Sequence, residues 1–138
     1  MNSHLIIHTD GGARGNPGPA GIGVYATAED GTVIFEISRY IGEATNNQAE
    51  YAAVIAALER SKESGVQEID FFLDSELVVK QMRREYKVKD AGLAQLFMKV
   101  HDLSLGFRRV SFSHVRREKN KDADRLVNEA IDRHLRGS

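Results

Sequence analysis

The sequence predicts an α/β fold in which a mixed five-stranded sheet carries helices on both faces. Two observations favour this class. The first third contains short β-prone runs separated by Gly-containing turns, and apolar patterns of helical period then alternate with further β-prone runs. The chain has 138 residues, which is the usual size of one domain. We therefore expect residues 1–138 to form a single domain.

The first third is expected to form three antiparallel strands. Residues 4–9 are a short apolar run that the Asp-Gly-Gly segment 10–12 interrupts, and this pattern is typical of a strand followed by a turn. Residues 20–27 and 32–40 flank the Glu-Asp-Gly segment 29–31. An Asp-Gly pair between two β-prone runs favours a hairpin.

The remaining residues alternate between helices and strands. Thr45 and Gln48 form a capping-box pattern that opens an Ala-rich helix over residues 46–61, and Gly65 follows its end. Residues 68–73 are a mostly apolar run, as expected for a strand covered on both faces. We expect Ser75 to cap a short helix that reaches Arg84 and carries Leu77, Val78 and Met82.

The last third continues this alternation. Asp90 caps a further helix, residues 108–115 form the final strand, and Asn120 caps the last helix, whose inward face is formed by Ala123, Leu126, Val127 and Ala130. The order is therefore β-β-β-α-β-α-α-β-α. Because helical crossovers join the first, fourth and fifth strands, these three should be parallel.

Composition restricts the class of protein. The chain has no Cys, so disulfides and zinc–thiolate sites are excluded. It has no basic signal-peptide region at its start and no run of roughly 20 apolar residues. We expect a monomeric cytoplasmic protein without membrane contact. The net charge of −1 argues against a nucleic-acid binder, but the basic residues are concentrated in the second half of the chain.

Two carboxylates follow apolar strands in the same way. Asp10 follows residues 4–9 and Asp74 follows residues 68–73, so parallel pairing would place both at the carboxyl end of the sheet. Two neighbouring carboxylates repel each other, and a divalent cation is the simplest compensation. Glu50 and Asp124 are further candidates, each near the start of a helix. Turn formation, helix capping and the helix dipole are the alternative explanations for these acids.

Four segments together resemble a known family. TDGGARGNPGPAGIG, TNNQAEYAAVIAAL, FFLDSELVVKQM and HVRREKNKDADRLVNEA are similar, in order and separation, to the motifs of type 1 ribonuclease H. The resemblance runs from Leu5 to about Arg133. It implies an endonuclease that hydrolyses the RNA strand of RNA–DNA hybrids and leaves a 5′-phosphate and a 3′-hydroxyl.

The resemblance also implies the metal ligands, which are Asp10, Glu50, Asp74 and Asp124. Asp10 would bridge two Mg²⁺ ions, with Mn²⁺ as a substitute. Asp124 would help to hold the ion that activates water, and Glu50 and Asp74 would hold the ion facing the leaving group. Hard oxygen ligands without Cys suit these ions.

Substrate contacts are implied for a second set of residues. Each has a structural alternative as a turn or capping residue, and the set is Gly11, Gly12, Asn16, Thr45, Asn46, Asn47, Gln48 and Ser75. The glycines would let the hybrid approach the backbone, and Asn46, Asn47 and Gln48 would contact sugars and base edges in the minor groove. Asn16 and Thr45 match family positions at phosphates of the DNA strand. Ser75 would touch the RNA strand.

Two departures from the best-known bacterial pattern indicate an archaeal-like subgroup. First, the pattern V-x-R-E-x-N-x-x-A-D before and into the last helix resembles that subgroup, which implies Arg117 as the group near the scissile phosphate, with His114 as the alternative. Second, the segment between Met82 and Leu93 is short and the chain has no Trp, so the basic, Trp-rich helix called the handle region is absent. Resemblance to this subgroup implies double-stranded RNA as a candidate second substrate.

Two other functions remain open from the sequence. A related nuclease of the same fold is one, although 3′–5′ exonucleases usually carry Asp-x-Glu on the first strand, where this chain has Asp10-Gly11-Gly12. A non-catalytic hybrid-binding module is the other, although such a module would be expected to lack one of the four carboxylates.

Overall fold

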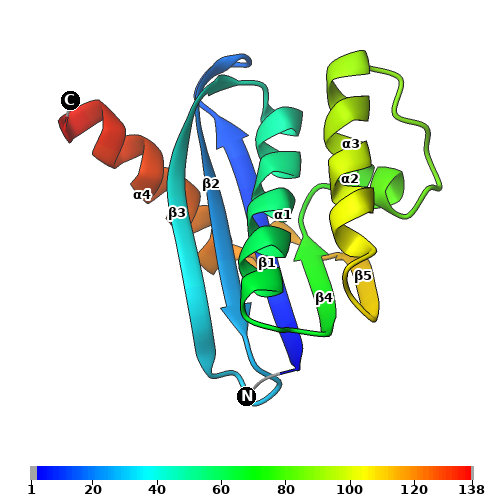
Figure 1. Ribbon diagram of the computed structural model, residues 1–138. Coiled ribbons are helices and arrows are strands. Elements are labelled where there is room, and N and C mark those ends of the chain that lie inside the picture. Colours follow the sequence, from blue (N-terminus) through cyan, green and yellow to red (C-terminus); the bar gives the residue numbers. More distant parts are fainter. Residues whose placement is uncertain (1–2, 138) are drawn as a thin grey trace.

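A computed structural model describes residues 3–137 and contains a five-stranded sheet in the order β3-β2-β1-β4-β5 (Figure 1). β1 pairs antiparallel with β2, β2 pairs antiparallel with β3, and β1, β4 and β5 are parallel. The predicted mixed sheet is confirmed. The strands are β1 His4–Ala13, β2 Gly18–Thr27, β3 Val33–Ala44, β4 Glu68–Leu73 and β5 Arg109–His114.

The helices cover the sheet from both sides. α1, α2 and α3 lie on one face, and α4 crosses the opposite face and packs against β1, β2 and β3 (Figure 1). The predicted order of elements is confirmed, with a short 3₁₀ helix, η1, added before α4. No helix in this part of the chain has the length and apolar character needed to span a bilayer. The helices are α1 Asn46–Glu63, α2 Glu76–Met82, α3 Ala91–Ser104, η1 Arg117–Lys119 and α4 Lys121–Gly137.

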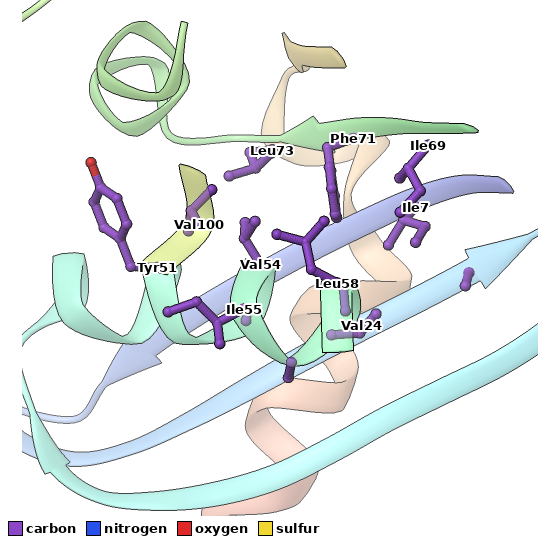
Figure 2. Close-up of a cluster of buried hydrophobic side chains, with 14 of the residues drawn as sticks. Ile7, Val24, Tyr51, Val54, Ile55, Leu58, Ile69, Phe71, Leu73 and Val100 are labelled. Carbon is purple, nitrogen blue, oxygen red and sulfur yellow. The ribbon is translucent and has the colours of Figure 1, made fainter. Parts of the chain in front are cut away.

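The core lies between α1 and the sheet (Figure 2). Val54 and Leu58 of α1 are fully buried beside Ile7 of β1 and Phe71 of β4. Burying a side chain of this size contributes roughly 2 kcal/mol each. This packing fixes α1 against β1, which carries Asp10, and against β4, which Asp74 follows. The core therefore determines where the site can form.

β1 is longer than predicted. The Asp-Gly-Gly segment 10–12 does not form a turn, because β1 continues through it and remains paired with β2 as far as Ala13 opposite Ala20. The actual turn follows at residues 14–17. Gly11 is required for helix packing, since a Cβ there would lie 2.2 Å from the carbonyl carbon and oxygen of Ala49 in α1.

The prediction that β4 is covered on both faces is wrong. Its side chains alternate between buried and partly exposed, because α4 covers only β1, β2 and β3. Asp70 lies on the open face and accepts hydrogen bonds from Arg109 at 2.5 Å and Ser111 at 2.6 Å. The Arg109 hydrogen bond, assisted by Ser111, holds the pKa of Asp70 well below its usual range.

Two local predictions also fail. The helix predicted to reach Arg84 ends at Met82, since Arg84 has a φ of 63°, which no α-helix allows; within α2, Leu77 is exposed and Val79 is buried. Asn120 does not cap α4 with its side chain. Its amide nitrogen instead donates to the carbonyl of Thr9 at 2.9 Å, so the residue ties the start of α4 to β1. The predicted inward face of α4 and the caps at Thr45, Ser75 and Asp90 are confirmed.

Candidate metal centre

Three carboxylates from separate elements meet at one edge of the sheet. Asp10 lies in β1, Glu50 in α1 and Asp74 directly after β4, and one oxygen of each lies within 4.8 Å of the others. The β1–β4 pairing ends at His8 and Phe72, two residues before Asp10 and Asp74, so these two side chains share a face. The convergence expected for Asp10, Glu50 and Asp74 is therefore present.

Asp124 joins this group from the first turn of α4. Asp124 is exposed and lines the same pocket as Asp10, and its charge helps to raise the pKa of Asp10. The approach depends on Gly23, which pairs with Asp10 across the β1–β2 ladder and faces α4. Because Gly23 has no side chain, the backbone of Ala123 packs directly on the strand and places Asp124 beside Asp10.

The electrostatics of the group are unfavourable when no cation is bound. Burial, followed by the charges of Asp74 and Asp124, raises the pKa of Asp10 to about 8. Burial, followed by the charge of Asp10, raises the pKa of Glu50 well above its usual range. Glu50 Oε2 is buried and has no hydrogen-bond partner. A buried acceptor without a donor, surrounded by oxygen ligands alone, fits a hard divalent cation.

An open pocket of about 380 Å³ surrounds the carboxylates. Arg117 of η1 lines it, and its charge lowers the pKa of Glu50 against the larger effect of burial. His114 is exposed at the end of β5 and is not among the lining residues. The structure therefore places Arg117, and not His114, beside the acidic group.

The residues expected to contact substrate divide into two groups. Gly11, Gly12, Asn46, Asn47 and Ser75 line the pocket. Asn16, Thr45 and Gln48 do not line it.

Several of these side chains already hold the start of α1 in place. Thr45 Oγ1 accepts from the Gln48 amide at 3.1 Å, and Gln48 Oε1 accepts from the Thr45 amide at 2.8 Å. Asn16 Oδ1 accepts from the Asn46 amide at 3.0 Å, and Asn46 Oδ1 accepts from the Ala13 amide at 2.8 Å. Thr45 and Gln48 thus form the predicted helix cap. The side-chain nitrogens of Asn16 and Asn46 remain available to a ligand.

Arg14 and Asn128 also line the pocket, although they are not among the site residues predicted from the sequence. Asn128 follows Asp124 by one helical turn, so its position on the same face of α4 could have been inferred. Arg14 lies in the turn after β1. A turn has no strand or helix period from which the direction of the Arg14 side chain could be predicted.

Comparisons with known proteins agree on one family. A family profile described as reverse transcriptase-like matches residues 8–130. Over 129 residues the chain is 46% identical to "Bifunctional protein Rv2228c" of Mycobacterium tuberculosis, covering 93% of this chain and 35% of that protein. It is 44% identical to Ribonuclease HI of Halobacterium salinarum, covering 89% of this chain and 62% of that protein. The chain thus spans about a third of the length of the mycobacterial relative.

Solved structures show the same relationship. LC11-RNase H1, isolated from compost, is 49% identical with a TM-score of 0.91, covering 96% of this chain and 99% of that one. The same protein has been solved in complex with an RNA/DNA hybrid, at 51% identity, a TM-score of 0.91 and coverage of 95% and 99%. The N-terminal RNase H domain of the mycobacterial protein is 44% identical with a TM-score of 0.90, covering 94% of this chain and 99% of that one.

Proposed function

The chain belongs to the ribonuclease HI family, and from this premise we propose that residues 1–138 form one domain that hydrolyses the RNA strand of RNA–DNA hybrids. The observation that carries the proposal is the convergence of Asp10, Glu50 and Asp74, with Asp124 beside Asp10, in a single open pocket. The hybrid complex of LC11-RNase H1 supports the choice of substrate.

The four carboxylates would hold two Mg²⁺ ions, with Mn²⁺ as a substitute. Such ions supply a nucleophilic water near neutral pH and stabilise the leaving oxygen. By the family resemblance, Asp10 would contact both ions, Asp124 would contact the one that activates water, and Glu50 and Asp74 would contact the other. The products would be a 5′-phosphate and a 3′-hydroxyl.

Recognition of the RNA strand would rest on the residues at the start of α1. Gly12 leaves the strand surface open, and the side-chain nitrogens of Asn46 and Asn47 are available to the 2′-hydroxyl or to base edges in the minor groove. Ser75 lines the same pocket. Asn16, Thr45 and Gln48 would contact the hybrid outside the pocket while they hold α1. The monomeric state and the cytoplasmic location stay predictions from the sequence.

The direct test is incubation of the full chain with an end-labelled RNA–DNA hybrid. We expect cleavage in the RNA strand with Mg²⁺, products bearing 5′-phosphates, and no cleavage when EDTA removes the metal. Duplex DNA should remain intact. A separate reaction with double-stranded RNA tests the second substrate that the archaeal-like pattern implies. Binding of the hybrid without cleavage under every metal condition would support the non-catalytic module instead.

Arg117 is expected to contribute more to catalysis than His114. Arg117→Ala should lower kcat/KM for hybrid cleavage by about 10²-fold, because it removes a cation facing the charge that develops on the phosphate. His114→Ala is the matched comparison, since that side chain lies outside the pocket, and its kcat/KM should stay within about threefold of wild type. The reverse order of the two effects would transfer the role to His114.

A further inference from the structure

The pocket extends along α4 beyond the carboxylates and reaches a second arginine. Val127, Asn128 and Ile131 continue its lining from Asp124, and Arg14 closes that end. Among the residues that line the pocket, Arg14 and Arg117 are the two with permanent positive charge. A strand laid over the carboxylates and continuing along α4 would therefore reach Arg14.

The guanidinium group of Arg14 is held from α4. Its Nη1 donates to Asp132 Oδ1 at 2.7 Å, and its Nη2 lies 3.4 Å from Asn128 Oδ1. The charge of Arg14 lowers the pKa of Asp132, mainly through this hydrogen bond, so Asp132 remains ionised and paired. The two contacts use two of the five N–H donors of the guanidinium group and leave others for a ligand.

The backbone of Arg14 is held as well. Its amide donates to the Pro19 carbonyl at 2.9 Å, which closes the turn between β1 and β2. Gly18 packs so closely that a Cβ there would lie 2.0 Å from the Arg14 carbonyl oxygen. Both ends of the residue are thus fixed, and a positioned guanidinium can bind a phosphate with little loss of conformational entropy.

A purely structural role explains this arrangement less well. The Arg14 and Asp132 side chains are 40% and 44% exposed, and an ion pair exposed to that degree adds little to stability. The pair nevertheless holds a cation at the rim of an acidic pocket, where a phosphodiester strand would be repelled unless cations were placed along its path.

We propose that Arg14 binds a phosphate of the RNA strand next to the scissile one, and that Asp132 is the positioning residue that aims it. The inference rests on the proposed function. The strand is assigned because Arg14 lines the same pocket as the metal-binding carboxylates, so it meets the strand that lies over them.

The test is a scan in which single RNA phosphates of a hybrid are replaced by neutral methylphosphonates. Binding is measured with the Asp10→Asn variant, which should not cleave, with and without Arg14→Ala or the length-preserving Arg14→Gln. We expect removal of Arg14 to weaken binding about tenfold and to lower the salt slope by about one. The Asp10→Asn parent should bind more weakly when one particular phosphate is replaced. The Arg14 variants should bind equally well with and without that replacement.

Arg108→Ala is the matched control, because it removes the same charge from an exposed side chain directly before β5, at the other end of the sheet. It should retain the phosphate profile of the parent. Asp132→Ala should reduce the loss of affinity caused by replacing that phosphate, and Asp132→Glu should restore this loss. A general loss of stability would not produce that pattern.

An unchanged profile in the Arg14 variants, or loss of a DNA-strand position in place of an RNA one, would overturn the assignment of Arg14. If the Asp10→Asn parent did not bind hybrids at all, the proposed function would fail together with this inference.

Discussion

Asp10→Asn is expected to reduce hybrid cleavage by at least about 10³-fold while making the metal-free protein more stable. The carboxylate is needed to hold the cations, so cleavage should fail even at high Mg²⁺. In the absence of metal the same carboxylate repels Asp74 and Asp124, and the amide removes that repulsion. One substitution should therefore change activity and stability in opposite directions.

The gain in stability should depend on pH with a defined sign. The pKa of Asp10 is raised to about 8 in the folded protein, against about 4 in an unfolded chain. The folded state thus binds this proton more tightly, so wild-type stability falls as pH rises from about 4 to about 8, relative to the variant. The variant should be more stable by about 2 kcal/mol above pH 8 and by almost nothing at pH 4.

Thermal unfolding in EDTA at pH 4.5 and pH 8.5 would measure this difference, which corresponds to about 7 °C at the higher pH. Asp102→Asn changes an exposed acid on α3 and is the matched control. Saturating Mg²⁺ should raise the wild-type midpoint but not that of Asp10→Asn, since only wild type would gain binding free energy. Equal midpoints for wild type and Asp10→Asn at pH 8.5 in EDTA would contradict the cost of burying this carboxylate beside Asp74 and Asp124.

Gly23→Ala is expected to destabilise the protein strongly, with a loss of about 3 kcal/mol or more. The new Cβ would lie 2.1 Å from the Ala123 carbonyl oxygen and 3.0 Å from Leu126 Cβ. Neither atom can move aside unless α4 as a whole moves away from β2. Because that movement carries Asp124 with it, hybrid cleavage should also fall in whatever protein remains folded.

Gly12→Ala is the matched control, since a Cβ on this neighbouring strand would meet its nearest atoms, Asn46 Oδ1 and Val127 Cγ1, at 3.9 Å. Urea unfolding should place it within about 1 kcal/mol of wild type. If Gly23→Ala unfolded at the same urea concentration as Gly12→Ala, the close packing of α4 would not be what positions Asp124.

The arrangement of elements could be predicted from the sequence because its signals are local. The capping box at Thr45 and Gln48 and the Asp-Gly hairpin at residues 29–31 act over a few residues, and both appear in the structure. Glycine is less informative, since it marks a turn and a close helix–strand contact equally well. The sequence therefore favours a turn at residues 10–12, although the close packing of α1 is what requires a glycine at Gly11.

The site could be predicted only in part, because its geometry is not local. Each of the four acids has its own simple explanation in the sequence, and the family resemblance, not the spacing, was what grouped them. Asn120 shows the same limit, since a residue well suited to cap α4 instead donates to Thr9. Arg14 was missed because its partner Asp132 lies near the other end of the chain.

Cation binding by carboxylates from β1, α1, β4 and α4 is the central claim, and anomalous diffraction from crystals soaked in Mn²⁺ with a bound hybrid tests it most directly. We expect two manganese peaks in the pocket, with Asp10 coordinating both and Glu50, Asp74 and Asp124 each coordinating at least one. Manganese found only at other surface acids, or a centre from which Glu50 or Asp124 stays away, would contradict the account.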